Sequence, residues 1–273
     1  MNLFFLPLAI IFCGGLLSLV FWRHFVLMKT IGVMGIGGGC LLGLIDAGTK
    51  LFRPETSTAA FEYLNAFSLS FQIDALAAFF LVAIYAVCLL AALYSYHYMD
   101  NSQKALRTAG NYFFFSLLTV FMALVVTAGN LFTFMQSWEI MSQSSFFLVI
   151  YNYEAEENRK AGYLYFVFSQ VGAMFILAAF GLIYAHTGNF GFADAAGLPE
   201  AAKIIVFVLA FIGLGSKAGV FPFHVWLPHA HPAASSHISA VMSGVMIKTG
   251  IYGIIRVYMM LDWHTPLFGH LVL

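Results

Sequence analysis

Three charged side chains lie within long apolar runs of this sequence, and proton transfer is the chemistry that their types allow. Glu139 is in LFTFMQSWEIMSQSSFFLV, Lys217 follows GLGS, and Lys248 is in SGVMIKTGIYG. If such runs cross a membrane, a charge there costs about 3 kcal/mol or more and marks a functional path by default. Burial disfavours the charged form of both a carboxyl and an amine. One carboxyl and two amines can therefore exchange protons, and we predict that these three residues form a relay.

Glu139 belongs to a polar stripe that also contains Gln136 and Gln143. Their spacing puts all three on one face of a helix, and such a face is expected to contact protein or water instead of lipid. The alternative is a seam of hydrogen bonds between helices, which polar residues often form in membranes. Such a seam needs amides and hydroxyls but no carboxylate, so Glu139 favours the relay.

Lys217 lies in a segment whose glycines and proline predict a broken helix. Pro222 lacks a backbone donor and disfavours helix in the residue before it, so we expect the break between Ser216 and Pro222. Helices broken within the membrane form ion sites in transporters, because they free backbone carbonyls there. We expect Lys217 to lie close to Glu139. The alternative is a lysine that extends from a shorter span toward the membrane surface.

Four histidines follow within fourteen residues: His224, His229, His231 and His237. Unperturbed imidazole changes charge near pH 6.5, so histidines can extend a relay. We predict His237 and His224 as members, with Ser216, His229 and His231 on a secondary polar path beside Gln136 and Gln143. Regular helical spacing would place His237 on the same face as Lys248, eleven residues later. A metal site is disfavoured because the segment lacks a known ligand spacing. The remaining alternative is that these are loop histidines that take no part in proton transfer or metal binding.

The composition indicates a membrane protein. Of 273 residues, 62% are hydrophobic and 9% are charged, and the mean hydropathy is +0.89. Soluble domains carry about 25% charged residues. Eight apolar runs are long enough to cross a bilayer as helices, and they cover residues 2–22, 30–48, 75–94, 112–129, 131–151, 162–184, 202–223 and 237–261. We therefore predict an all-α integral membrane protein of about eight transmembrane helices with a broken seventh helix.

The loop charges divide into two sets that predict the orientation. One set contains Arg23, Lys29, Lys104, Arg107, Arg159 and Lys160, and the other contains Lys50, Arg53, Lys203 and Arg256. The first set is expected on the cytoplasmic side of the inner membrane, which puts the N-terminus outside. The connection 50–74 is expected to lie on the surface as a short helix or a hairpin. A net charge of zero argues against nucleic acid as a partner, and the three cysteines form no motif for a metal or a cofactor.

Three motifs in order give the sequence a family resemblance. SWEIM, SKAGVFPFHVWLPHAHP and SGVMIKTGIYGIIR closely resemble the antiporter-like proton-translocating subunits of complex I, Mrp cation/proton antiporters and membrane-bound hydrogenases. The resemblance covers roughly residues 70 to 260. The histidine-rich segment is most similar to the hydrogenase-4 and formate hydrogenlyase branch.

The resemblance implies a role for each of the three charges. In this family the residue at Glu139 pairs with that at Lys217, and the one at Lys248 passes the proton toward the centre of the subunit. The family fold has about fourteen helices with two inverted repeats of five. Residues 1–110 would then hold helices one to three, 111–261 the first repeat, and 262–273 the start of a truncated ninth helix. We accordingly expect a fragment, a split gene or an incomplete chain.

The implied function is proton translocation by a non-catalytic subunit of a redox-driven complex. Its partners would be other membrane subunits, the lipid bilayer, protons and a peripheral arm that carries out the redox chemistry, with no cofactor in this subunit. Two alternatives remain open. One is a subunit of an Mrp-type cation/proton antiporter without redox partners, and the other is a truncated subunit with only a structural role.

Overall fold

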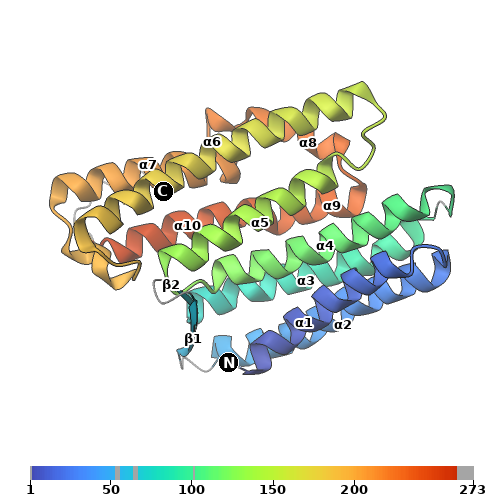
Figure 1. The fold of residues 1–273 in the computed structure, drawn as a ribbon, viewed down its shortest axis with the longest axis horizontal. Coiled ribbons are helices and arrows are strands. Elements are labelled where there is room, and N and C mark those ends of the chain that lie inside the picture. Colours follow the sequence, from blue (N-terminus) through green and yellow to red (C-terminus); the bar gives the residue numbers. More distant parts are fainter. Residues whose placement is uncertain (1, 53–55, 64–66, 101, 263–273) are drawn as a thin grey trace.

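The computed structural model describes residues 2–52, 56–63, 67–100 and 102–262, and it consists of helices that run side by side (Figure 1). In chain order the elements are α1 (Asn2–Val20), α2 (Phe25–Phe52), β1 (Ser57–Tyr63), β2 (Phe67–Ile73), α3 (Ala75–Tyr98), η1 (Ser102–Lys104), α4 (Ala105–Val126), α5 (Leu131–Val149), α6 (Glu156–Thr187), η2 (Ala193–Gly197), α7 (Glu200–Ala218), η3 (Phe223–Trp226), α8 (Leu227–Ala233), α9 (Ser236–Val241), the π-helix η4 (Met242–Met246) and α10 (Ile247–Met260).

Six of the eight apolar runs each fall mainly on one helix; the run 202–223 continues past the end of α7 to η3, and the run 237–261 covers α9, η4 and α10. In the described part of the chain, six helices are long and apolar enough to cross a membrane, namely α2, α3, η1 with α4, α6, α7 to α8, and α9 to α10. The apolar part of α1, Phe4–Val20, is shorter. Helix α5 has 19 residues, and its polar side chains lower its mean hydropathy. The multi-pass helical membrane architecture is thus confirmed.

Glycines let neighbouring helices approach closely. A Cβ on Gly14 of α1 would lie 2.5 Å from the Cα of Gly35 of α2. A Cβ on Gly213 of α7 would lie 2.5 Å from the carbonyl oxygen of Gly172 of α6. Small residues at such contacts increase van der Waals packing, which drives helix association where lipid removes the hydrophobic driving force. The α6–α7 contact fixes the helix that carries Lys217.

The two sets of basic residues lie at opposite ends of the helices (Figure 1), except that Arg53 is outside the described residues. One end, here called the basic end, contains the α1–α2, α3–α4 and α5–α6 loops (Figure 1). There Lys29 pairs with Asp100 at 2.8 Å, and Arg107 pairs with Glu154 at 2.6 Å. The opposite end contains β1 and β2 and is called the hairpin end.

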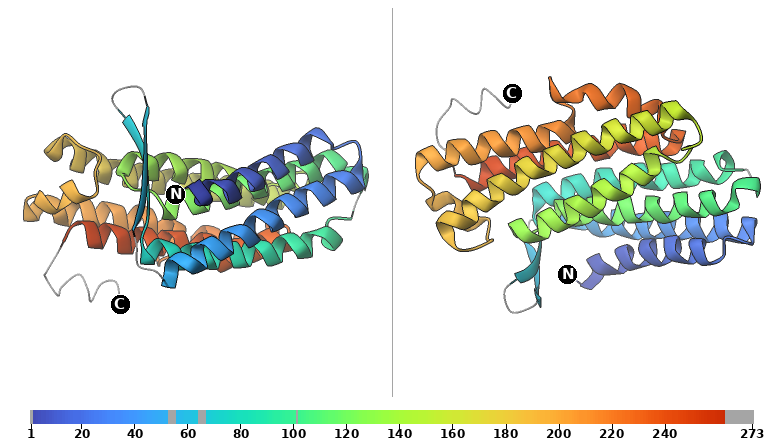
Figure 2. Two further views of the ribbon diagram at one scale, coloured as in Figure 1. Left: turned by 90° about the horizontal axis from the view of Figure 1, so that it is seen from below. Right: turned by 45° about the horizontal axis from the view of Figure 1, so that its top comes forward.

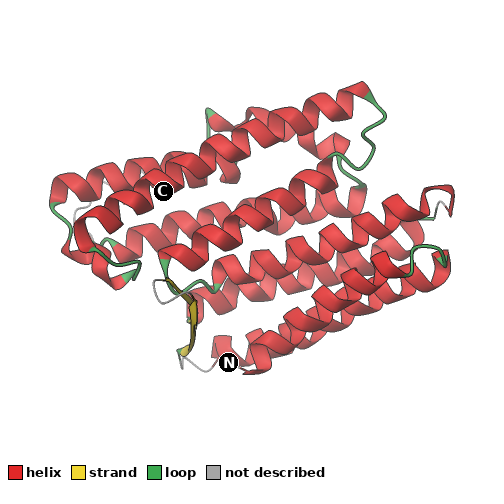
Figure 3. Cartoon of the chain, viewed as in Figure 1, coloured by secondary structure: helices red, strands yellow, loops and turns green. Residues whose placement is uncertain are grey.

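The connection before α3 is a β-hairpin, which is one of the two forms expected for it (Figure 3). It stands out from the helices in both views of Figure 2. Its β2 strand is tied to the α4–α5 junction, because Gly129 N donates to Ser70 O at 2.7 Å and Gln72 N donates to Thr127 O at 2.7 Å. These bonds satisfy backbone groups at the ends of two spans.

An ion pair at the hairpin end joins the start of α3 to α10. Asp74 caps α3 by accepting from Ala77 N at 2.8 Å, and its carboxylate oxygens lie 2.6 and 3.0 Å from two nitrogens of Arg256. Burial alone would raise the pKa of Asp74, but the hydrogen bonds from Arg256 and Ala77 and the charge of Arg256 lower it overall. Arg256 also donates to the Tyr252 hydroxyl, which donates to Val126 O of α4 at 2.7 Å. Asp74 therefore holds three helices together.

Asp74→Asn is expected to destabilise the chain by about 2 kcal/mol at neutral pH, because it removes a charged partner from Arg256. Since the pKa of Asp74 is lowered on folding, this contribution is present above pH ~4 and is lost as the pH falls through the folded value. Thermal unfolding of both variants between pH 3 and 8 measures the difference, which should narrow only below pH ~4. Glu156→Gln, which breaks an exposed pair with Lys160, is the control with little effect. If the difference in unfolding temperature between wild type and Asp74→Asn stayed constant down to pH 3, this role of Asp74 would be contradicted.

Two expected boundaries differ from the structure or lie beyond it. The division between residues 110 and 111 falls inside α4, which begins at Ala105. The expected ninth helix, 262–273, lies almost entirely outside the described residues.

Candidate functional site

Lys217 is in the last turn of α7, where the helix breaks as expected. It is 4% exposed. Gly219 ends the helix with a positive φ of 75°, and Val220 N donates to Gly215 O at 2.9 Å. The indole nitrogen of Trp226 in η3 donates to Ser216 O at 2.8 Å. The break therefore places Lys217 in the last turn of α7, at the negative end of the helix dipole, where cations are commonly found.

Lys217 contacts hydroxyl groups of two other helices. Its Nζ lies 2.5 Å from the hydroxyl of Tyr165 on α6 and 3.2 Å from Oγ of Ser142 on α5. The Tyr165 hydroxyl lies 2.5 Å from Ser145 Oγ, which in turn donates to Ser142 O at 2.8 Å. Since the ammonium can only donate, Tyr165 accepts from it and donates to Ser145. Three helices thus meet at one charged side chain.

Glu139 does not form a direct ion pair with Lys217 in the structure. It lies three residues before Ser142 on α5, so it is one helical turn from the serine that Lys217 contacts. Glu139 and Gln143 are half-buried and Gln136 is exposed, whereas Ser142 and Ser145 are buried. The glutamate stripe therefore runs along the outer side of α5, and the serines connect that helix to Lys217.

His237 is the buried histidine of the four. It is 1% exposed, and its Nε2 lies 2.9 Å from Oδ1 of Asn111 on α4, with Tyr98 and Phe115 edge-on to the ring. Its Nδ1 and the side-chain nitrogen of Asn111 are buried, and neither has a hydrogen-bond partner among the described residues. Buried polar atoms of this kind commonly bind water. His237 and Asn111 therefore form a second polar cluster. Within the described part of the chain, no hydrogen bond joins it to the Lys217 cluster, which consists of Lys217, Tyr165, Ser142 and Ser145.

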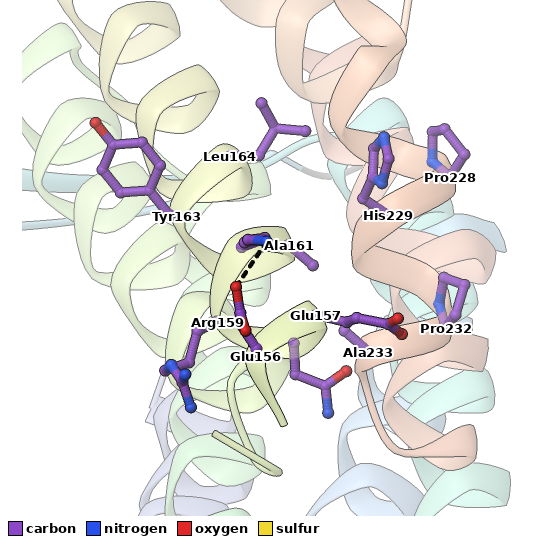
Figure 4. A pocket seen from close by; sticks show the side chains of 12 residues that line it. Glu156, Glu157, Arg159, Ala161, Tyr163, Leu164, Pro228, His229, Pro232 and Ala233 are labelled. Carbon is purple, nitrogen blue, oxygen red and sulfur yellow. Dashed lines mark ion pairs between the residues drawn. The ribbon is translucent and has the colours of Figure 1, made fainter. Parts of the chain in front are cut away.

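The other three histidines lie toward the surface. His224 is exposed, and its ring packs beside that of Phe221. Nδ1 of His231 lies 3.1 Å from Oγ of Ser239. His229 on α8 lines a groove of about 750 Å³, which Glu157 lines from α6 (Figure 4). None of these three is hydrogen-bonded to Lys217 or His237 within the described chain.

Lys248 does not share a face with His237, contrary to the sequence prediction. His237 is buried, whereas Lys248 is exposed on the surface of the described chain. Eleven residues of regular α-helix return to within about 20° of the starting face. The π-helix η4 lies between the two residues and holds more residues per turn, so it rotates the residues that follow it. The ammonium of Lys248 bends back and donates to the carbonyl oxygen of Ser243 within η4.

Helix η4 also reaches the Lys217 cluster. The Tyr165 hydroxyl lies 4.0 Å from Sδ of Met246, and Thr249 Oγ1 lies 3.7 Å from Sδ of Met141 on α5. The helix that carries Lys248 therefore packs on the tyrosine that binds Lys217. Sequence reasoning missed Tyr165 and Asn111, because a tyrosine or an asparagine on an apolar helix does not reveal its partner.

Among the described residues, no group of three His, Cys, Asp or Glu side chains is placed to hold a metal ion. What the arrangement offers is a buried amine bonded to hydroxyls of two helices, with a carboxylate one turn away. A lysine in such surroundings can take up and release a proton, and hydroxyls can conduct it.

Two family models match the sequence. The model described as NADH:quinone oxidoreductase/Mrp antiporter, TM, matches residues 128–272, and that of NADH-Ubiquinone oxidoreductase (complex I), chain 5 N-terminus, matches residues 63–107.

Curated relatives extend the similarity to named subunits. Hydrogenase-4 component B of Escherichia coli (strain K12) is 37% identical over 236 residues, which are 85% of this chain and 34% of that protein. A putative antiporter subunit, mnhA2, of Staphylococcus saprophyticus is 28% identical over 69% of this chain and 24% of that protein. The chain spans about a third of the length of the hydrogenase-4 relative.

Solved structures share the fold. An archaeal membrane-bound sulfane sulfur reductase matches with a TM-score of 0.79 and 28% identity, over 93% of this chain and 40% of that one. The Mrp complex from Dietzia sp. DQ12-45-1b matches with a TM-score of 0.83 and 22% identity, over 99% of this chain and 29% of that one.

Proposed function

The chain belongs to the NADH:quinone oxidoreductase/Mrp antiporter membrane family, and we propose that it is a proton-translocating subunit of a redox-driven membrane complex of the hydrogenase-4 type. The chain spans about a third of the length of its hydrogenase-4 relative, so the activity of the whole protein is part of this proposal. The observation that carries the proposal is Lys217, a buried lysine at a helix break, whose ammonium is bonded to Tyr165 and Ser142.

In the proposed relay, Lys217 stores a proton and exchanges it with Glu139 through Ser142. The Ser142 hydroxyl accepts from Lys217, so its own proton is free to bond toward Glu139, one turn away. When Lys217 releases a proton, the positive charge moves to the next acceptor and the lysine becomes neutral. Lys248 is the next acceptor, because its helix packs on Tyr165 through η4.

His237 with Asn111 provides the proposed entry from the basic end. The unpartnered nitrogens of this pair can bind water that conducts protons from that surface. His224, His229, His231, Ser216, Gln136 and Gln143 are the secondary polar path. His229 at the groove is suited to collecting protons, and Gln136 and Gln143 border Glu139.

The proposed setting is the inner membrane, with the basic end in the cytoplasm and the N-terminus outside. Other membrane subunits are the proposed partners, because the half-exposed stripe of Glu139 would otherwise face lipid at high cost. Electron transfer is assigned to a peripheral arm of the complex, and this chain is proposed to need no cofactor of its own.

A cation/proton antiporter subunit is the second candidate. It is supported by the 28% identity to the putative antiporter subunit of Staphylococcus saprophyticus. Both candidates use the same buried charges. They differ in the source of energy for proton movement, which is electron transfer in the first and a cation gradient in the second.

Proton uptake by inside-out vesicles that contain the complete complex tests the function. With an electron donor, a redox-driven subunit is expected to acidify the vesicles in proportion to electron transfer, without added sodium. Acidification that requires an imposed sodium gradient and ignores the electron donor would support the antiporter instead. Electron transfer without any proton movement would contradict both.

A further inference from the structure

A small space borders Lys217 on the side of α6. Its polar lining residues are Ser169, Ser216 and Lys217, and Trp138 and Trp226 also line it. The space open to the centre of a water molecule is about 10 Å³, close to what one water needs.

Two polar groups at this space have unused hydrogen-bonding capacity. Ser169 Oγ is buried and has no hydrogen-bond partner among the described residues. The ammonium of Lys217 has three donors, and the described contacts use two of them, to Tyr165 and Ser142. A buried hydroxyl without a partner costs about 1–3 kcal/mol, so native proteins seldom leave one.

The space lies close to the break at the end of α7, and its shape follows from how α6 packs on α7. Gly172 and Gly213, which both line it, bring α6 and α7 into contact, and a Cβ on Gly172 would lie 3.3 Å from Cβ of Ser216. Trp226 is held over it by the bond to Ser216 O, which the end of α7 leaves free. An apolar void would stay dry, but this one offers the two or more polar partners that a buried water requires.

We propose that this space holds a single water molecule, which accepts from Nζ of Lys217 and hydrogen-bonds to Oγ of Ser169. Ser169 is thereby a positioning residue that helps to solvate the charged lysine inside the membrane. This inference rests on the proposed function, since it concerns how Lys217 keeps its proton. The ionisable side chain that contacts Lys217 is Tyr165 on α6. Glu139 on α5 is one turn from Ser142 but lies on the outer side of that helix. The elements η3 and η4 contribute Trp226 and Met246, which do not titrate.

The test is the pH profile of proton translocation by the complete complex with Ser169→Ala, Ser169→Thr and Ser116→Ala. Loss of the water leaves the charged lysine less well solvated, so Ser169→Ala is expected to move the midpoint by about one unit to lower pH. Ser169→Thr keeps a hydroxyl and should retain the wild-type midpoint. Ser116 is buried on α4 and bonded to its own helix at Phe113 O, so Ser116→Ala should change nothing.

A cryo-EM map of the complex that resolves other buried waters provides the second measurement. Density for one water between Ser169 and Lys217, absent in Ser169→Ala, is the expected result. An unshifted midpoint in Ser169→Ala, or no density at this position, would overturn the inference. If Lys217→Met also leaves translocation intact, the proposed function itself fails, whereas loss in Lys217→Met with no effect of Ser169→Ala refutes the water site alone.

Discussion

Lys217→Met is expected to lower proton translocation by roughly a hundredfold, the loss typical of removing a group that transfers a proton. Methionine has nearly the length of lysine and fills the same apolar surroundings, so the packing of α7 on α6 is retained. The substitution removes the ammonium group, which donates hydrogen bonds to Tyr165 and Ser142. The measurement is proton uptake in vesicles, with electron transfer followed in parallel.

Lys203→Met is the matched control, because Lys203 is a buried lysine on the same helix. Its ammonium lies 3.9 Å from a carboxylate oxygen of Glu200 at the hairpin end, away from the break. This variant is expected to translocate protons at close to the wild-type rate. Equal losses in the two variants would show that any buried lysine of α7 serves folding, and Lys217 would then have no special role.

The helices and the break could be predicted from sequence because their causes are local. An apolar run of sufficient length has to be helical in lipid, and Gly219 and Pro222 stop a helix whatever packs around them. The hairpin was one of two expected forms, because its strands depend on the α4–α5 junction. Ser70 pairs with Gly129, 59 residues along the sequence, and no local pattern reports that contact.

The partners of the charges were less predictable, because they arise from tertiary packing. Tyr165 is 52 residues from Lys217 in the sequence, and Asn111 is 126 residues from His237. Neither residue type announces a proton path by itself. The sequence places the stripe of Glu139 and the serine hydroxyls near it on one helix, but it does not reveal that Ser142 contacts Lys217.

The prediction that His237 and Lys248 share a helix face was wrong for a different reason. The prediction assumed a constant helical period over eleven residues, and the π-helix η4 changes that period. π-Helices are rare in general but frequent at functional sites, so a regular period is least reliable where chemistry is concentrated. Here the π-helix supplies the carbonyl to which Lys248 donates.

Lys248→Met and Lys248→Arg are both expected to lower proton translocation by roughly a hundredfold, because neither side chain can bind and release a proton at accessible pH. Methionine has no titratable group. Arginine keeps the charge and a donor for Ser243 O, but its guanidinium holds its proton. Assembly and thermal stability of the complex should stay close to wild type in the methionine variant, since removing a charge from a membrane span relieves a cost. Lys160→Met, at an exposed pair of the basic end, is the control.

The order of the two variants separates a proton store from a structural lysine. If Lys248 only holds η4 by donating to Ser243 O, arginine can replace it and methionine cannot, so Lys248→Arg would pump and Lys248→Met would assemble poorly. If Lys248 stores a proton, both fail to pump and both assemble. Exposure on the described chain does not distinguish the two roles, because a lysine halfway along a span needs protein or water around it in either case. Undiminished pumping in Lys248→Met would remove Lys248 from the relay and leave Lys217 to pass its proton by another route.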